Sequence, residues 1–325
     1  MAEIGFELYN NQLIQKLVGV SDSNLKLIEQ TLDVEILNFG NEMTIKGEKE
    51  SVEKAKETVM LLYDKVSRGV EIGEEEVKAA LRICNGNLSQ AEKHDFNEMV
   101  LKTKKRHIYP RSAMQAKYIE EMMKNELVFG LGPAGTGKTY LAVALAVSMM
   151  IEGAVDKIIL SRPAVEAGEN LGFLPGDLKE KVDPYLRPLY DALYEMLPAE
   201  TVDKKLSIGE IEIAPLAFMR GRTLSNAFVI LDEAQNTTPM QMKMFLTRLG
   251  ENSRMVVNGD LSQVDLPKGV VSGLRDALDT LKNVSNISSV TFTSKDVVRH
   301  GLVAKIVQAY EEKTKKQQEK DNEKF

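Results

Sequence analysis

The chain has 325 residues, 42 of them basic and 48 acidic, which gives a formal net charge of −6. Its 43% hydrophobic and 28% charged residues are typical of a soluble globular protein and exclude collagen-like, low-complexity and wholly disordered classes. The single cysteine, Cys84, excludes an intramolecular disulfide framework, and the acidic balance restricts any nucleic-acid site to a local basic surface. The first residues are acidic where a signal peptide would be basic, and the longest apolar run, residues 141–151, is about half of what a bilayer requires. We therefore expect a cytoplasmic protein without a membrane partner, and the length predicts two domains.

Residues 1–68 are predicted to form a small α+β domain. The expected elements are helices over residues 11–18 and 24–32, then a hairpin formed by residues 34–39 and 43–45 around a Gly-Asn turn. Residues 51–66 fit an amphipathic helix that Ser51 is expected to cap. A further helical stretch that ends in a basic run fills residues 69–108, which we interpret as a linker.

From residue 109 to residue 310, short apolar runs alternate with helices. The expected strands cover residues 126–130, 157–160, 227–231 and 254–258, and the expected helices cover residues 140–151 and 240–249. Buried strands that alternate with helices predict an α/β domain with a mostly parallel sheet and helices on both faces. Residues 311–325 are charged and nearly free of apolar side chains, so we expect a flexible charged tail.

The most specific motif is GPAGTGKT at residues 132–139. It matches the phosphate-binding pattern G-x-x-x-x-G-K-[ST] and stands between a predicted strand and a predicted helix. Its glycines permit backbone angles that point successive N–H groups at phosphate oxygens, and the following helix begins with its positive end there. Lys138 is expected to reach the β- and γ-phosphates of ATP, and the Thr139 hydroxyl is expected to bind Mg²⁺. The residues expected to bind the nucleotide here are Gly132, Pro133, Ala134, Gly135, Thr136, Gly137, Lys138, Thr139 and Tyr140.

Two further predicted strands end in polar residues. Asp232 and Glu233 follow an apolar run; Asp232 is expected to act in the Mg²⁺ site, and Glu233 to polarise the attacking water as a general base. Gln263 follows the next strand and is expected to sense the γ-phosphate, although a simple polar turn is the alternative there. The paired glutamate favours hydrolysis over phosphoryl transfer to a metabolite.

Two sets of residues resemble known families. Residues 232–235, DEAQ, with 259–263, GDLSQ, resemble the ATPase core of superfamily 1 helicases. In that resemblance Gln115 matches a glutamine that reads adenine, and Arg299 matches an arginine that stabilises transition-state charge. The longer blocks at residues 161–177, 215–223, 231–236 and 296–300 are similar to PhoH family proteins. Membership implies a RecA-like P-loop domain that hydrolyses ATP with Mg²⁺, coupled to RNA binding, remodelling or unwinding in ribosomal RNA processing.

The resemblances also imply partners. Superfamily 1 helicases bind ATP between two tandem domains, whereas this sequence continues only briefly after the first. A ring-like homo-oligomer, a hexamer by family resemblance, would supply the missing face and an arginine in trans. Residues 19–22 are similar to the loop of a KH module, which binds single-stranded RNA, but Asp22 replaces the second glycine and repels phosphate. The N-terminal unit is therefore expected either to bind RNA or to have a purely structural or oligomerising role. The alternative to a helicase is a nucleotide-switched adaptor that assembles a ribosomal-RNA-processing nuclease without unwinding.

Overall fold

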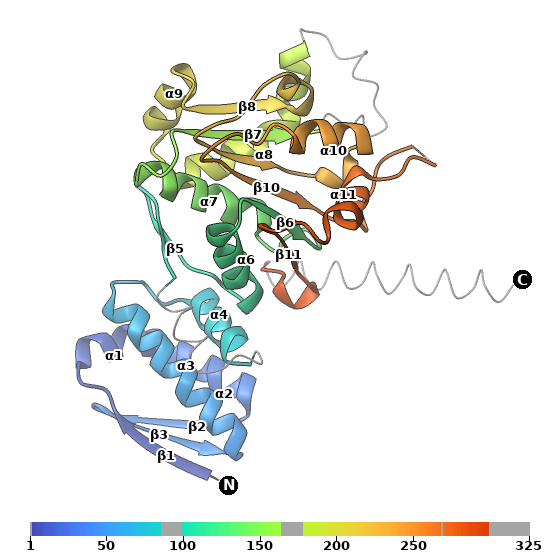
Figure 1. The fold of residues 1–325 in the computed structure, drawn as a ribbon. Helices are drawn as coiled ribbons and strands as arrows, with labels where there is room; N and C mark the ends of the chain where they lie inside the picture. Colours follow the sequence, from blue (N-terminus) through green and yellow to red (C-terminus); the bar gives the residue numbers. More distant parts are fainter. Residues whose placement is uncertain (1, 86–98, 164–177, 268, 299–325) are drawn as a thin grey trace, which may run out of the picture.

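The computed structural model describes residues 2–85, 99–163, 178–267 and 269–298. Within these ranges the chain forms a smaller N-terminal unit and a larger unit built around a second sheet, which lie at opposite ends of Figure 1. The predicted tail, residues 311–325, and Arg299 lie outside the described residues.

The N-terminal unit is an α+β structure, as predicted. Its elements are β1 (Ala2–Glu7), α1 (Asn11–Val18), η1 (Val20–Asp22), α2 (Ser23–Leu32), β2 (Glu35–Phe39), β3 (Glu42–Gly47), α3 (Lys49–Ser67) and α4 (Glu74–Asn85). Strand β3 lies between β1 and β2 and is antiparallel to both, with Ile45 opposite Ile4 and Ile36. The first two helices and the hairpin are confirmed, whereas β1 was not predicted. The KH-like character of the unit stays a prediction.

The predicted cap of the third helix is wrong. Helix α3 begins at Lys49, so Ser51 lies inside its first turn, and the N-cap residue Glu48 makes no side-chain capping hydrogen bond. The start of this helix follows instead from its apolar face, on which Val52 and Val59 are fully buried against the sheet and the other helices. Burial of such a face outweighs the contribution of a single cap.

The stretch between residues 69 and 108 is only partly helical. Helix α4 packs on α2 and α3, and its residues Val77 and Ala80 belong to the N-terminal hydrophobic core together with Cys84, a buried thiol as predicted. Strands β4 (Leu101–Lys102) and β5 (His107–Ile108) then pair as a short hairpin whose apolar residues join the core of the larger unit. The placement of a domain boundary in this stretch stays a prediction.

The larger unit has six parallel strands in the order β11-β6-β10-β9-β7-β8. Its elements are α6 (Ala113–Lys124), β6 (Leu127–Leu131), α7 (Lys138–Ile151), β7 (Lys157–Arg162), α8 (Leu178–Met196), α9 (Ala199–Ser207), β8 (Ile211–Pro215), η3 (Leu216–Met219), β9 (Ala227–Leu231), η4 (Ala234–Asn236), α10 (Pro239–Leu246), β10 (Arg254–Gly259), α11 (Gly273–Leu281), β11 (Ile287–Thr291) and η5 (Ser294–Asp296). This α/β architecture confirms the predicted RecA-like P-loop fold. Because β10 lies between β6 and β9, the carboxyl ends of these three strands meet at one edge.

Helices cover both faces of this sheet (Figure 1). Val128, Ile230 and Val256 face the core shared with α6, α7, α8 and α9. The alternate strand residues Phe129 and Val257 face the core that contains Phe245 of α10 and residues of α11. Since both faces are buried, the strands are almost continuously apolar, and their periodicity in the sequence is therefore weak. Over the described ranges, no helix combines the length and apolar character needed to cross a membrane.

A close approach at the centre of this sheet makes a stability prediction. The Tyr118 hydroxyl donates to Asn258 Oδ1 at 2.5 Å, directly over Gly130. A Cβ at position 130 would collide with Asn258 Oδ1 and lie 2.9 Å from the Tyr118 hydroxyl oxygen. We expect Gly130→Ala to lower the free energy of unfolding by about 1–3 kcal/mol, measured by urea denaturation. Gly5→Ala is the control, because its Cβ meets nothing closer than 3.9 Å, and an equal loss in both variants would contradict the prediction.

Candidate nucleotide-binding site

The glycine-rich loop at residues 132–139 connects β6 to α7, as predicted. Gly132 has a φ of 132°, and a Cβ there would lie 2.5 Å from the Phe292 carbonyl oxygen. Gly137, with a φ of 81°, is the N-cap residue of α7. Both positions need the conformational freedom of glycine. The loop therefore leads into the N-terminus of α7, where unpaired N–H groups and the helix dipole attract anions.

Lys138 is held inside this loop. Its side chain is buried, and Nζ donates to the carbonyl oxygens of Gly132 at 2.6 Å and Pro133 at 2.9 Å, with the Thr136 hydroxyl at 3.3 Å. The ammonium group thus lies where the loop curves around it. From this position it can exchange carbonyl oxygens for phosphate oxygens with little movement of the chain.

Thr139 and Asp232 meet across the edge of the sheet. The Thr139 hydroxyl donates to Asp232 Oδ1 at 2.6 Å, and the Asp232 N–H donates to the Ser161 carbonyl at the end of β7 at 2.9 Å. Hydroxyl and carboxylate oxygens are the ligands that Mg²⁺ prefers, usually beside phosphate oxygens and water. The Thr139 hydroxyl and the Asp232 carboxylate, which meet at 2.6 Å, therefore fit a Mg²⁺ site that is shared with phosphate oxygens and water.

The buried Asp232 carboxylate makes a prediction about pH and stability. Burial, and after it the charge of Glu233, raises the pKa of Asp232 above its ordinary value. A raised pKa means that ionisation of Asp232 lowers the free energy of unfolding. This penalty is absent below the ordinary carboxyl pKa and complete above the raised pKa. We expect Asp232→Asn to raise the melting temperature of the ligand-free protein by about 2–4 °C at neutral pH. Thermal unfolding at several pH values should show that the gain shrinks as the pH falls, and an equal gain at every pH would contradict the prediction.

Glu233 is oriented by two donors. It has a φ of 53°, in the left-handed region, and its Oε1 accepts from Arg162 Nη2 at 2.8 Å. Its Oε2 accepts from Gln235 Nε2 at 2.6 Å. Arg162 is itself fixed because Nη1 donates to the Tyr185 carbonyl at 2.8 Å. The carboxylate is therefore held in one orientation at the wall of a cavity beside Asp232.

Gln235 joins this carboxylate to the neighbouring segment after β10. The side chain is 1% exposed, its Oε1 accepts from the Asp260 N–H at 3.0 Å, and Nε2 also donates to the Gln263 carbonyl at 3.3 Å. Gln235 therefore contacts both the Glu233 carboxylate and the backbone of Gln263. The sequence places Gln235 in the helicase-like motif at residues 232–235 and Arg162 in the PhoH-like block at residues 161–177, but it assigns neither side chain a role. Both residues also follow the end of a predicted parallel strand.

A cavity of about 490 Å³ brings most of the predicted site together. It is lined by Ala134, Gly135, Gly137, Lys138, Thr139, Tyr140, Asp232, Glu233 and Gln263 of the predicted set, and also by Arg162. Gln115 lies on the other side of the loop, where its Oε1 accepts from the Arg111 N–H at 2.6 Å and its Nε2 donates to the Thr136 carbonyl at 3.0 Å. The predicted catalytic Arg299 lies outside the described residues.

A parallel sheet, a glycine-rich phosphate loop and an Asp-Glu pair at the end of a nearby strand together define a nucleotide-binding protein of the P-loop ATPase class. The profile described as PhoH-like protein matches residues 107–311. This chain belongs to that family, the PhoH-like proteins. It is 51% identical over 306 residues to the PhoH-like protein of Bacillus subtilis, covering 94% of this chain and 96% of the relative.

A second relative matches a smaller share of the chain. Protein PhoH of Escherichia coli K12 is 49% identical over 205 residues, which is 62% of this chain and 58% of the relative. Among solved structures, the UvsW helicase from bacteriophage T4 aligns with a TM-score of 0.35 and 11% identity over 66% of this chain and 70% of the helicase chain. That likeness is too weak to carry an argument about function.

Proposed function

We propose that this protein hydrolyses ATP with Mg²⁺ and couples hydrolysis to binding and remodelling or unwinding RNA, in the processing of ribosomal RNA. The observation that carries the ATPase proposal is the contact of Thr139 with Asp232, with the oriented Glu233 carboxylate beside it in one cavity. Hydroxyl, carboxylate and general base are the parts that phosphoryl transfer to water requires.

Each residue has a stated part in the proposed reaction. Lys138 and the loop N–H groups bind the phosphates, and Thr139 and Asp232 would hold Mg²⁺, which would neutralise charge on the phosphates. Glu233 accepts the proton of a water molecule whose oxygen attacks the γ-phosphorus, while the bond to the β-phosphate oxygen breaks. Gln263 reports the γ-phosphate to Glu233 through Gln235. An arginine from a neighbouring copy in a hexameric ring completes the site.

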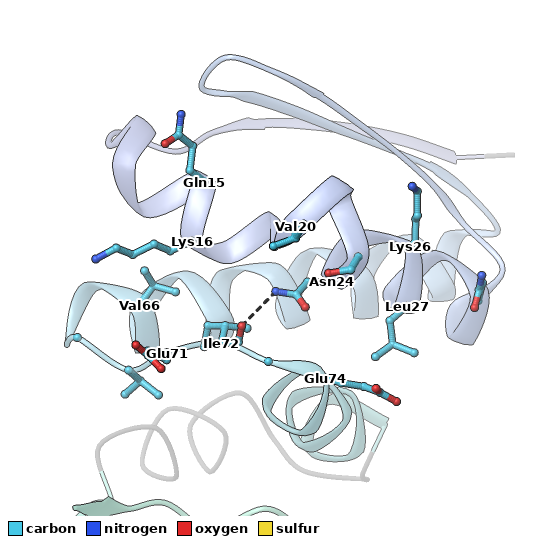
Figure 2. Close-up of a pocket in the computed structure, with 16 residues that line it drawn as sticks. Gln15, Lys16, Val20, Asn24, Lys26, Leu27, Val66, Glu71, Ile72 and Glu74 are labelled. Atoms are coloured by element: carbon cyan, nitrogen blue, oxygen red, sulfur yellow. Dashed lines mark hydrogen bonds between the residues drawn. The ribbon is translucent and has the colours of Figure 1, made fainter.

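The proposed RNA contact lies on the N-terminal unit (Figure 2). A groove of about 860 Å³ runs between α1, α2 and the segment after α3. Lys16 and Lys26 line it, and Lys26 Nζ donates to the Ser21 carbonyl of the loop between the two helices at 2.9 Å. Glu71 and Glu74 line the groove as well, so its positive charge is confined to the side of α1 and α2. A narrow basic edge of this kind suits the backbone of a single strand.

A second candidate is the nucleotide-switched adaptor. The two hydrogen bonds to Glu233 favour this adaptor. A carboxylate that accepts from Arg162 and Gln235 is a weaker general base, and it polarises water poorly until one of these hydrogen bonds breaks. In this alternative, slow hydrolysis times the assembly of a nuclease partner, and RNA is bound without strand separation.

Steady-state ATP hydrolysis by the full chain, with and without single-stranded RNA, tests the proposal. RNA should stimulate turnover in the wild type, and the stimulation should be absent in a Glu233→Gln background. A Lys16→Glu, Lys26→Glu double variant should lose RNA stimulation but keep basal turnover, because these lysines lie far from the phosphate loop in the sequence and line a separate groove. Slow hydrolysis that RNA does not change would favour the adaptor, and no hydrolysis at all would reject the ATPase proposal.

A further inference from the structure

A second cavity lies on the Gln115 side of the phosphate loop. It has a volume of about 630 Å³, within the range of pockets that hold small ligands. It shares Gly135, Gly137, Tyr140 and Glu195 with the 490 Å³ cavity, so the two spaces meet at the loop and at the first turn of α7.

The orientation of a bound nucleotide decides what this second cavity can hold. In the proposed reaction the γ-phosphate faces Glu233, at the end of β9. The nucleoside must then leave the loop in the other direction. Gln115 lies there, directly below the loop, since a Cβ on Gly137 would approach its Nε2 to 3.0 Å. The rings of Tyr109 and Tyr140 also line this cavity and offer apolar surface to a base.

One wall of the same cavity belongs to the N-terminal unit. The end of α3 contributes Lys65 and Arg68, and α4 contributes Glu76 and Ala79. Lys65 is buried, and its Nζ lies 5.6 Å from the centroid of the Tyr109 ring. Burial lowers the pKa of Lys65, because it removes water from the charged ammonium group. Hydrogen-bond acceptors of a ligand in the cavity would stabilise this charged form.

Ion pairs hold this wall against the larger unit. Arg111 lies 3.7 Å from Glu76 and 4.0 Å from Glu75, both on α4. The Arg111 N–H also donates to Gln115 Oε1, and Gln115 in turn donates to the Thr136 carbonyl in the phosphate loop. A continuous set of contacts therefore runs from α4 through Arg111 and Gln115 to the loop.

We propose that the 630 Å³ cavity binds the nucleoside part of ATP and that the N-terminal unit supplies one wall of it. The inference rests on the proposed function, because it takes the 490 Å³ cavity as the phosphate site. Its consequence is that the N-terminal unit contacts the nucleotide directly. ATP binding and the unit proposed to hold RNA are thus coupled within one copy of the chain.

Binding measurements with two ligands test this proposal on the full chain. ATP would use both cavities, whereas inorganic tripolyphosphate would use only the phosphate loop. Ala79→Met places a longer side chain into the cavity, and Arg68→Ala removes a group from its wall. We expect each to weaken ATP binding by about tenfold or more, and to leave tripolyphosphate binding unchanged, in titration calorimetry. Lys78→Met is the matched control, because the neighbouring Lys78 does not line the cavity, and it should bind both ligands as the wild type does.

The outcomes separate the two proposals. Wild-type affinity for ATP in both variants would overturn the nucleoside cavity, and so would an equal loss of both ligands in Arg68→Ala. Amide hydrogen exchange of the wild type tests the proposal without a variant. ATP, but not tripolyphosphate, should lower the exchange rates of the amides of residues 65–70. Equal protection by both ligands, or by neither, would also overturn it. If the wild type binds neither ligand, the phosphate site and with it the proposed function fail.

Discussion

Replacing Glu233 by glutamine is expected to reduce ATP hydrolysis by about 10²–10⁴-fold while leaving ATP binding close to that of the wild type. Glutamine keeps the size of the side chain and can still accept from Arg162, but its amide cannot take the proton of the attacking water. Hydrolysis is measured as phosphate release at saturating ATP, and binding by calorimetry on the same preparation.

The matched control for this variant is Asp191→Asn. Asp191 is an exposed carboxylate that lines the same cavity, so its replacement changes the charge of the cavity equally and removes no proposed base. It should retain most of the activity. Equal losses in the two variants would mean that the cavity needs negative charge rather than a general base at Glu233, and undiminished hydrolysis by Glu233→Gln would reject the assignment.

Replacing Lys138 by alanine is expected to weaken ATP binding by about 10²-fold or more and to abolish measurable hydrolysis, because the buried ammonium inside the loop is lost. The measurement is the rise in melting temperature that ATP and Mg²⁺ cause, which follows ligand affinity directly. This rise should disappear in Lys138→Ala.

The control for this prediction is Lys157→Ala, at the exposed start of β7 and outside both cavities. It changes the net charge by the same amount and should keep the full nucleotide-dependent rise. A Lys138→Ala protein that ATP stabilises as strongly as the wild type would place the nucleotide elsewhere.

The sequence predicted the site where short segments determine it. The phosphate loop adopts backbone conformations that favour glycine, so its glycines are visible in the sequence. The Asp232-Glu233 pair follows a strand of five consecutive apolar residues, Ala227–Leu231, which is equally clear in the sequence. Parallel strands bring their carboxyl ends to one edge, so the nearness of Thr139 to Asp232 also followed. Gln235 could not be assigned in this way, because its role depends on Asp260, which only the strand order brings near.

The details of the fold that the sequence did not reveal have similar causes. Strand β1 has the alternating exposure of an edge strand, but its Glu residues were considered only as acidic charge. Ser51 has the right residue type for a cap, yet the start of α3 is set by the side of the helix that faces the sheet. Helix α4 was interpreted as part of a linker because nothing within residues 74–85 shows that their apolar side faces α2 and α3.

The strand order of the larger sheet bears on how the site forms during folding. Strands β6, β10 and β9 are neighbours in space, although β7, β8 and the helices α7, α8 and α9 lie between β6 and β9 in the chain. The phosphate loop is continuous in the sequence, but its partner Asp232 reaches it only when these long-range strand pairings close, which is slow in parallel sheets. A chain in which these pairings have not closed would therefore lack the contact between Thr139 and Asp232. A nucleotide bound at this edge would therefore stabilise the completed sheet as a whole.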